Sequence, residues 1–298
     1  MRNQDKGFLF ALAAALLWST VASAFKLTLR YVDHLQLLFY SSLVSTVVLG
    51  VILGVRGELR SAFAATPAQY RRSIALGFTN PFAYYLILFK AYDLLPAQLA
   101  QPLNFTWGLT LPLLSIPLLK HKLRARDFAA LVLGYAGVMV ISTRGSLLDF
   151  SLSDPLGVAL AVGSAFVWAL YWIYNTKDDR PPVTCLFLSF LFGVPFALVV
   201  CVVFSHLAVP DVRGWVGCLY VGVIEMSVTF VLWLMALRLS ENTARVSMMI
   251  FVSPFFSLVF IHFLVGEDIL PSTVTGLLLI VAGLVLQRWA RRGPPETG

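Results

Sequence analysis

The feature that most limits how this chain can fold is a series of ten apolar stretches, each long enough to cross a membrane as a helix. A transmembrane helix needs about 20 mostly apolar residues. The stretches lie near residues 7–27, 35–54, 72–92, 96–119, 127–143, 155–174, 183–204, 214–237, 243–264 and 270–289. Charged residues make up 12% of the chain, compared with about 25% in soluble domains. The sequence therefore predicts an all-α integral membrane protein, with residues 1–298 forming a single transmembrane domain of ten helices.

Positive charge is distributed unevenly over the two sides of such a bundle. With alternating spans, all but five of the 22 Lys and Arg residues fall on the side that holds the N-terminus. By the positive-inside rule this side is cytoplasmic, so both termini, including a tail at 290–298, are expected inside the cell. The net charge of +7 is explained by these helix ends. We therefore expect a lipid bilayer as a partner, and no nucleic acid.

Motifs for other functional classes are missing from the sequence. The three cysteines and four histidines are scattered, without the close spacing of a metal site, so no metal or other cofactor is expected. No G-x-x-x-x-G-K-[ST] motif occurs, which argues against an ATP-driven pump. An integral membrane enzyme remains an alternative, although neither paired acidic motifs nor a Gly-flanked Ser with a deep His is found.

Three segments of the first half are similar to three segments of the second half, in the same order. The pairs are 11–18 with 161–168, 77–91 with 222–236, and 134–138 with 280–284, at offsets of 150, 145 and 146 residues. This pattern predicts two five-helix repeats, at 7–143 and 155–289. Because five is odd, the second repeat enters the membrane from the opposite side. Inverted repeats are typical of secondary transporters that work by alternating access, with the substrate site near the middle of the membrane.

The repeated segments also point to a known family. Two kinds of segment carry the resemblance: the Ala-rich segments that end in Trp18 and Trp168, and the segments KAYDLLPAQLAQPLN (90–104) and MALRLSENTARVSMM (235–249). They resemble the EamA-like branch of the drug/metabolite transporter (DMT) superfamily. The resemblance covers residues 8–289. Within this branch the chain is most similar to the bacterial aromatic amino-acid exporters. The resemblance implies a secondary transporter that exports small organic solutes, above all aromatic amino acids, across the bacterial inner membrane.

One departure from the family pattern is visible. The acidic turn Gly266-Glu267 in the second repeat has Lys120-His121-Lys122 as its counterpart in the first repeat. A role for an acidic residue at this turn is therefore not carried over to the first repeat. A general drug/metabolite exporter, or an exporter of other amino acids with the same fold, is the alternative reading of the resemblance.

Glu225 is the first candidate site residue, because it lies near the middle of the stretch 214–237. An ionised carboxylate there costs about 2.5–3.5 kcal/mol or more, so it must face protein or water. In a regular helix Thr229 shares its face, and the counterpart in the first repeat is Asn80, with Tyr84 on the same face. We expect these four residues to line a substrate site, in which Glu225 contacts an ammonium group or carries a coupling proton. The structural alternative is a Glu225 that only hydrogen-bonds neighbouring helices.

Tryptophan placement gives the second set of candidates. Trp18, Trp107, Trp168 and Trp172 fall well inside the apolar stretches, away from the interfacial belts in which Trp is usually enriched. Their faces can stack on a planar ring and attract an ammonium group, at about 0.5–2 kcal/mol each. The alternative is that they only pack against other helices. We expect them to form the walls of the substrate site.

The stretch 96–119 is too polar and too rich in proline for a helix that faces lipid. Gln101, Asn104 and Gly108 share one face of a regular helix, and we expect Gln101 and Asn104 to contact substrate. Backbone carbonyls freed by proline need protein or water as partners. Pro81 and Pro254 are candidate gating hinges, with static kinks as the alternative.

The polar and aromatic candidates predict which parts of the chain surround the substrate. We expect a polar cavity lined by the stretches near 7–27, 72–92, 96–119, 155–174, 214–237 and 243–264. The plain Leu, Val and Gly composition of 127–143 and 270–289 predicts a peripheral place for these two.

Overall fold

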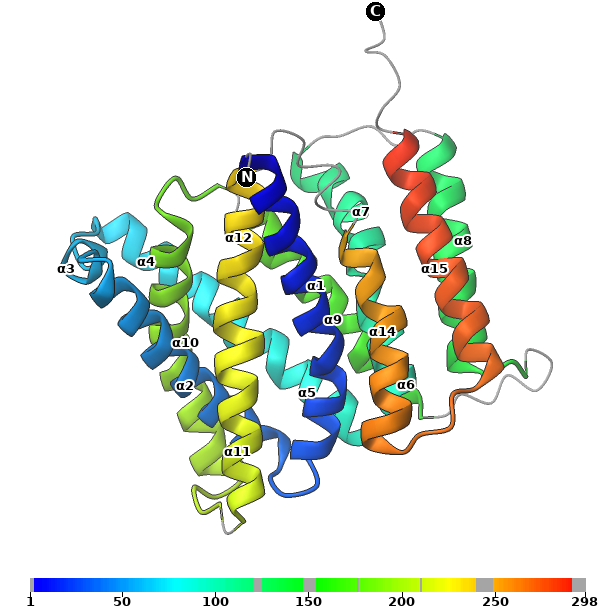
Figure 1. Cartoon of the computed structure of the whole chain (residues 1–298), viewed down its shortest axis with the longest axis horizontal. Helices are drawn as coiled ribbons and strands as arrows, with labels where there is room; N and C mark the ends of the chain where they lie inside the picture. The colour runs from blue at the N-terminus through cyan, green and yellow to red at the C-terminus, as the bar shows by residue number, and fades with distance from the viewer. Residues whose placement is uncertain are drawn as a thin grey trace, which may run out of the picture.

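The protein is a bundle of helices (Figure 1). The computed structural model describes residues 3–119, 125–146, 154–175, 177–209, 211–239 and 249–290. Within these ranges the chain is helical, with turns and short loops between the helices and no β-strand. The all-α membrane fold predicted from the sequence is therefore confirmed, while the number of crossings stays a prediction. The motif at 120–122, the tail after Ala290 and most of the segment 235–249 lie outside the described residues.

The described part of the first half of the chain contains nine helical elements. They are α1 (Asn3–Thr28), α2 (His34–Val55), α3 (Leu59–Ala62), α4 (Pro67–Gly77), the π-helix η1 (Phe78–Ala83), α5 (Tyr84–Leu94), α6 (Ala97–Phe105), α7 (Trp107–Leu119) and α8 (Ala125–Ser142). The described part of the second half continues in the same way. Its elements are α9 (Pro155–Asn175), α10 (Pro182–Phe204), α11 (Val212–Tyr220), the π-helix η2 (Val221–Val228), α12 (Thr229–Leu239), the 3₁₀-helix η3 (Met249–Val252), α14 (Ser253–Phe260), the π-helix η4 (Ile261–Val265) and α15 (Pro271–Ala290).

Several of these helices are long and apolar enough to cross a membrane. Among the described residues these are Asp5–Thr28, His34–Val55, Pro155–Asn175, Pro182–Phe204 and Val212–Leu237. Shorter apolar helices cover Phe128–Ser142, Met249–Val265 and Pro271–Leu286. The predicted stretches 72–92 and 96–119 are interrupted instead. Asn80, with φ −144° and ψ 119°, breaks the first, and the second divides into α6 and α7 at Thr106.

Local sequence signals explain where the helices of the first half begin. Asp33 caps α2 through the backbone N–H groups of Leu35 and Gln36, and the Gln36 side chain accepts in return from the Asp33 N–H. Thr66 caps α4 in the same reciprocal way with Gln69. Such capping boxes satisfy backbone donors that the first turn of a helix leaves unpaired.

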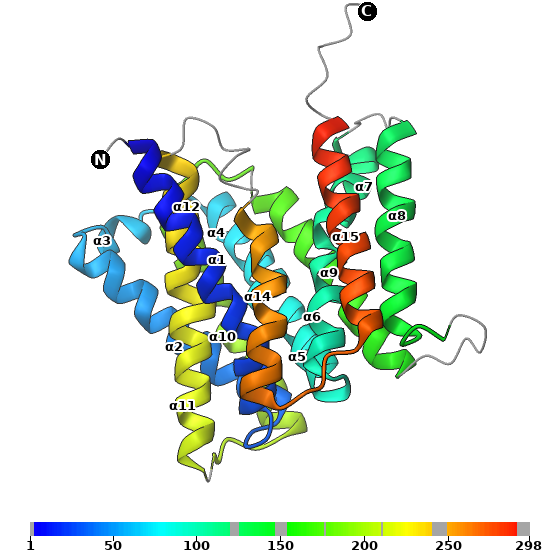
Figure 2. The same cartoon turned by 45° about the vertical axis from the view of Figure 1, so that its right-hand side comes forward.

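The packing partners of the helices exchange between the two halves. α1 packs against α12 and α14, while its counterpart α9 packs against α5 and α7. α2 contacts η2 and its counterpart α10 contacts η1; α2 also packs against α10, and α8 against α15. α8 and α15 lie side by side at one edge of the bundle in both views (Figures 1 and 2). This edge position agrees with the peripheral place expected for 127–143 and 270–289.

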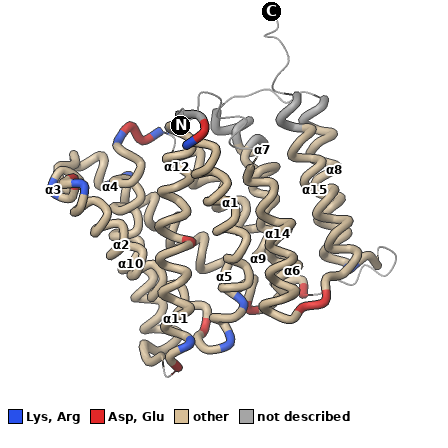
Figure 3. The backbone as a smooth tube through the Cα atoms, viewed as in Figure 1, with Lys and Arg blue, Asp and Glu red and all other residues tan. Residues whose placement is uncertain are grey.

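The ends of the bundle differ from its middle in charge. Lys, Arg, Asp and Glu residues lie mainly near the two ends of the helices (Figure 3). α1 begins and α15 ends at the same end of the bundle (Figure 1). The middle of the bundle is consequently apolar, apart from buried polar residues such as Glu225, which is 7% exposed.

Two glycines permit the closest helix approaches around the breaks. A Cβ atom on Gly77 would lie 2.3 Å from the Ser189 carbonyl oxygen of α10. A Cβ atom on Gly222 would lie 2.6 Å from the Ser41 carbonyl oxygen of α2. Small residues allow membrane helices to pack backbone against backbone. A glycine therefore allows close backbone packing at both places, next to η1 against α10 and in η2 against α2.

Candidate functional site

A cavity lies among the helices that carry most of the candidate site residues. Its empty volume is about 680 Å³, counting the part that opens to the outside. It is lined by Trp18, Val21 and Phe25 of α1, Tyr84, Leu88 and Tyr92 of α5, Gln101, Asn104, Phe105 and Trp107 of α6 and α7, Trp168 and Trp172 of α9, Glu225 and Trp233 of η2 and α12, and Ile250 and Ser253 of η3 and α14. The six predicted lining stretches are thus confirmed. Among the described residues, α8 and α15 contribute none of the lining.

The structure brings together eight of the ten residues expected to contact substrate. These are Trp18, Tyr84, Gln101, Asn104, Trp107, Trp168, Trp172 and Glu225. Asn80 and Thr229 are not among the lining residues. Asn80 lies where a helix breaks, and Thr229 directly follows the π-helix η2. At both places α-helical spacing no longer predicts which way a side chain points.

Asn80 is fully buried, in the break between α4 and α5. Its amide lies beside Tyr171, yet its nitrogen and its oxygen have no hydrogen bond of normal geometry. The next residue, Pro81, packs its ring against Gly193 of α10. The backbone of Asn80 leaves the helical conformation, and its side chain lies beside Tyr171 of α9. It does not line the cavity with Glu225, which the repeat had suggested.

Thr229 is fully buried at the end of η2. Its hydroxyl donates to the Ile224 carbonyl oxygen at 2.6 Å. A π-helix bonds i to i+5 and holds more residues per turn than an α-helix. The expectation that Thr229 shares the face of Glu225 assumed α-helical spacing, and the π-helix explains why it is wrong.

Glu225 is the acidic group of the cavity. Its Oε1 accepts a hydrogen bond of 2.9 Å from the hydroxyl of Tyr85, which is fully buried. Its Oε2 is buried without a hydrogen-bond partner, and the Trp18 indole also approaches the carboxylate. Sequence reasoning missed Tyr85, because its contact with η2 spans 140 residues and no local pattern marks it.

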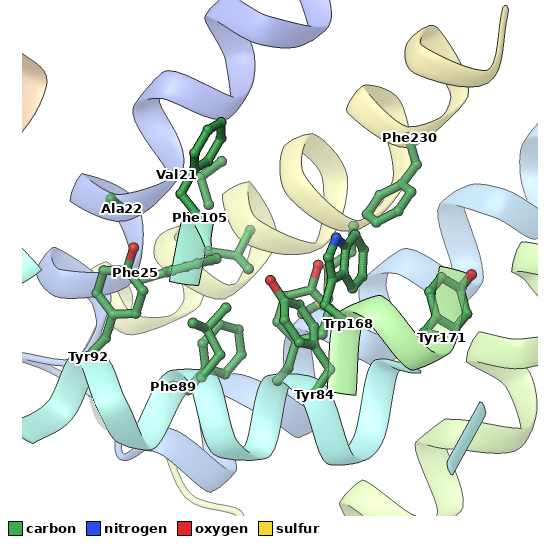
Figure 4. Packing of buried hydrophobic residues seen from close by; sticks show 14 of the residues in the cluster. Val21, Ala22, Phe25, Tyr84, Phe89, Tyr92, Phe105, Trp168, Tyr171 and Phe230 are labelled. Carbon is green, nitrogen blue, oxygen red and sulfur yellow. The ribbon is translucent and has the colours of Figure 1, made fainter. Parts of the chain in front are cut away.

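Aromatic rings form the walls around this carboxylate. Tyr84 and Trp168 stack with centroids 4.5 Å apart and planes 29° apart, and Figure 4 shows them side by side. Trp172 meets Trp168 edge to face at 5.9 Å. On the other side, Trp18 lies 5.5 Å from Trp233. Trp233 was not predicted as a site residue, because it lies only about one turn inside the stretch 214–237.

Two amide side chains are held in place by the cavity wall. The Asn104 Nδ2 donates to Ser164 Oγ at 2.9 Å, and the Tyr84 hydroxyl donates to Asn104 Oδ1 at 3.3 Å. The Tyr92 hydroxyl donates to Gln101 Oε1 at 2.8 Å. Gly108, expected on the same face, packs against Leu284 of α15 instead. The break at Thr106 explains the difference, because it changes the helical phase between α6 and α7.

Polar contacts join several elements next to the lining residues Phe25 and Tyr92. The Lys26 ammonium donates to the carbonyl oxygens of Tyr92 and Leu95, at 2.7 and 2.8 Å. Glu267 accepts from the backbone N–H groups of Ala97 and Gln98, at 2.8 and 3.0 Å, which caps the first turn of α6. These contacts bind the α5–α6 turn to α1 and to the turn before α15.

The two prolines proposed as hinges lie where helix geometry changes. Pro81 lies inside η1. Pro254 is the second residue of α14, directly after the 3₁₀-helix η3 and beside the lining residue Ser253. Their positions suit a change in helix direction, and their part in gating stays a proposal.

Comparison with known proteins assigns the family. The sequence pattern of the EamA-like transporter family matches residues 5–143 and 155–288. The chain belongs to the EamA-like transporter family. This confirms the resemblance drawn from the sequence, and it makes the chain a membrane transporter of the EamA type.

Relatives of this EamA-like transporter are distant. An "Uncharacterized transporter" of Archaeoglobus fulgidus is 25% identical, over 95% of this chain and 97% of its own length. The "Aromatic amino acid exporter YddG" of Ancylobacter novellus is 23% identical, over 78% of this chain and 79% of its own length. The "Uncharacterized inner membrane transporter YhbE" of Escherichia coli K12 is 24% identical, over 56% and 53%. A solved crystal structure with 21% identity and a TM-score of 0.67 covers 98% of this chain and 99% of its own, which shows the same fold.

Proposed function

We propose that this EamA-like transporter exports aromatic amino acids across the bacterial inner membrane, by alternating access around the cavity at Glu225. The proposed contacts to substrate are the eight predicted residues that line the cavity. The observation that carries the proposal is one buried carboxylate surrounded by aromatic walls. A ring stacks on Trp and Tyr faces, while an ammonium group meets both the carboxylate and the ring faces.

Two further observations support alternating access between inverted halves. The family pattern matches the chain twice, in two segments close to the predicted repeats. The helix contacts also exchange between the halves, with α1 packing on α12 as α9 packs on α5. In such transporters the halves rock around a fixed central site. Pro81 and Pro254 are proposed to absorb part of the change in helix direction.

Support for the direction, location and substrate class comes from relatives. The Ancylobacter novellus relative is named as an aromatic amino acid exporter. The Escherichia coli relative is named as an inner membrane transporter. The excess of Lys and Arg on one side of the predicted bundle supports cytoplasmic termini. A general metabolite exporter is the second candidate, because other relatives are named only as transporters.

Transport by the purified protein in liposomes tests this proposal. Labelled phenylalanine is expected to cross the membrane faster than in protein-free liposomes, and a pH gradient shows whether protons are coupled. Unlabelled Trp, Phe and Tyr are expected to compete more strongly than Ala or Ser, because only the former stack on the cavity walls. Equal competition by all five would favour the general metabolite exporter. No transport of any of them would refute the proposal.

A further inference from the structure

The charge inside the cavity is one-sided. Among the described residues that line it, Glu225 is the one acidic group, and no Lys, Arg or His is present. The neighbouring cation on α1, Lys26, lies next to the lining residue Phe25 but donates to the carbonyl oxygens of Tyr92 and Leu95. The cavity lining therefore offers no positive charge to a substrate, and it offers a negative charge when Glu225 is ionised.

The Glu225 carboxylate has capacity for one more donor. Tyr85 donates to Oε1 at 2.9 Å and the Trp18 indole approaches the carboxylate, while Oε2 is buried without a hydrogen bond of normal geometry. The Glu225 side chain is 7% exposed. A buried carboxylate oxygen without a donor is unfavourable. An ammonium group at Oε2 supplies both the donor and the compensating charge.

A substrate carboxylate finds less at this site. The amide nitrogen of Asn104 already donates to Ser164, and the amide oxygens of Asn104 and Gln101 are acceptors, which cannot serve a carboxylate. The Trp172 Nε1 is buried without a partner and offers a neutral N–H. Neutral donors of this kind, including the Gln101 amide nitrogen and the Ser253 hydroxyl of the lining, do not offset the repulsion between two carboxylates in a site of low dielectric.

The aromatic walls act in the same direction. Trp18, Trp168, Trp172 and Trp233 surround the space beside Glu225. The faces of aromatic rings carry negative partial charge, so they attract a cation and repel an anion. Ring stacking and charge selection are therefore combined in one site.

We propose that this cavity binds aromatic amines with a net positive charge and no carboxylate more tightly than the parent amino acids. The proposal rests on the proposed transport function, since it concerns the same site. It extends the substrate class from aromatic amino acids to the amines, amides and esters that keep the ring and the ammonium group.

A matched set of four phenyl compounds tests the proposal by calorimetry with the purified protein. Phenethylamine and phenylalanine amide are cations, phenylalanine is a zwitterion, and 3-phenylpropionate is an anion. At about pH 6 the amino groups are protonated. We expect phenylalanine amide to bind about tenfold more tightly than phenylalanine, since the two differ mainly in the buried charge. No binding of 3-phenylpropionate is expected. Phenylalanine binding as tightly as its amide would overturn the proposal.

Two variants show whether the preference comes from Glu225. In Glu225→Gln, the amide and phenylalanine are expected to bind within about twofold of each other, because the fixed charge is gone while the hydrogen bond from Tyr85 is kept. In Thr229→Val, which lies outside the cavity, the wild-type ratio is expected. An unchanged ratio in Glu225→Gln would contradict the proposed cause.

The outcomes separate this inference from the proposed function. If phenylalanine is transported in liposomes and binds as tightly as its amide, the function stands and the charge preference fails. If the amide binds more tightly but no compound is transported, the charge preference stands and the function fails. If none of the four compounds binds, both are wrong.

Discussion

The two π-helical segments η1 and η2 occupy matching places in the two halves, yet only one of them presents a functional group to the cavity. Gly77, just before η1, and Gly222, within η2, lie 145 residues apart in the sequence, and each allows backbone contact with the second helix of the other half. Asn80 and Glu225 follow at the same spacing. Asn80 is fully buried beside Tyr171 of α9, whereas Glu225 lines the cavity.

This difference separates the packing that the two halves share from the functional group that only η2 of this pair presents to the cavity. The glycine contacts keep the halves together on both sides, so packing follows the repeat. The chemistry does not, because Asn80 leaves the helical conformation while η2 continues with π-helical bonding that aims Glu225 at Tyr85. Position in a repeat therefore predicts packing better than it predicts function.

The largest effect is expected from the two shared glycines. In Gly77→Ala and Gly222→Ala, the added Cβ meets backbone oxygen at 2.3 and 2.6 Å, so the helices must separate. We expect little folded, monodisperse protein from either variant by size-exclusion chromatography. Gly163→Ala in α9 is the matched control, because no atom lies within 4 Å of its Cβ. A normal yield and melting temperature for both Gly77→Ala and Gly222→Ala would show that the shared packing is not needed.

A large effect on transport, but not on folding, is expected from Glu225→Gln. Glutamine can still accept the hydrogen bond from Tyr85, but it carries no charge and releases no proton. We expect phenylalanine transport in liposomes to fall about tenfold or to lose its pH dependence, with a melting temperature near that of the wild type. Full transport at every pH would mean that Glu225 serves only to hold helices together.

A smaller effect is expected at the aromatic wall. Trp168→Phe keeps an aromatic ring but reduces the stacked area against Tyr84. We expect phenylalanine to bind about threefold more weakly, the loss typical of one weakened aromatic contact. Tyr84→Phe is the matched control for the ring, because it removes only the hydroxyl that donates to Asn104. Unchanged affinity in Trp168→Phe would place the substrate ring elsewhere.

The smallest effect is expected from Asn80→Ala. The Asn80 amide makes no hydrogen bond of normal geometry, so its removal breaks no strong polar interaction. We expect transport within about twofold of the wild type. If Asn80→Ala reduces transport as much as Glu225→Gln does, the two segments share one functional role, and the contrast between them is wrong.

Much of this arrangement could be predicted from the sequence. Hydropathy, and the position of a polar residue along an apolar stretch, can be read without knowing the tertiary structure. The apolar stretches indicated the helical membrane fold, and the midspan Trp residues and Glu225 indicated which helices surround the cavity. Asn80, Thr229 and Gly108 were misplaced for one physical reason: each lies at or beyond a break, where α-helical spacing fails. Tyr85, the partner of Glu225, could not be found because their contact is purely tertiary.

Protection of Glu225 by substrate is the most direct test that the cavity at η2 is the binding site. A carbodiimide modifies carboxyl groups, and mass spectrometry then measures the modified fraction of each one. With phenylalanine at about ten times its Kd, we expect labelling of Glu225 to slow about tenfold, since substrate occupies the cavity by mass action. Glu267, which caps α6 and is not among the residues lining the cavity, serves as the internal control and is expected to be unaffected. Labelling of Glu225 at the same rate with and without saturating phenylalanine would contradict the assignment of this cavity as the substrate site.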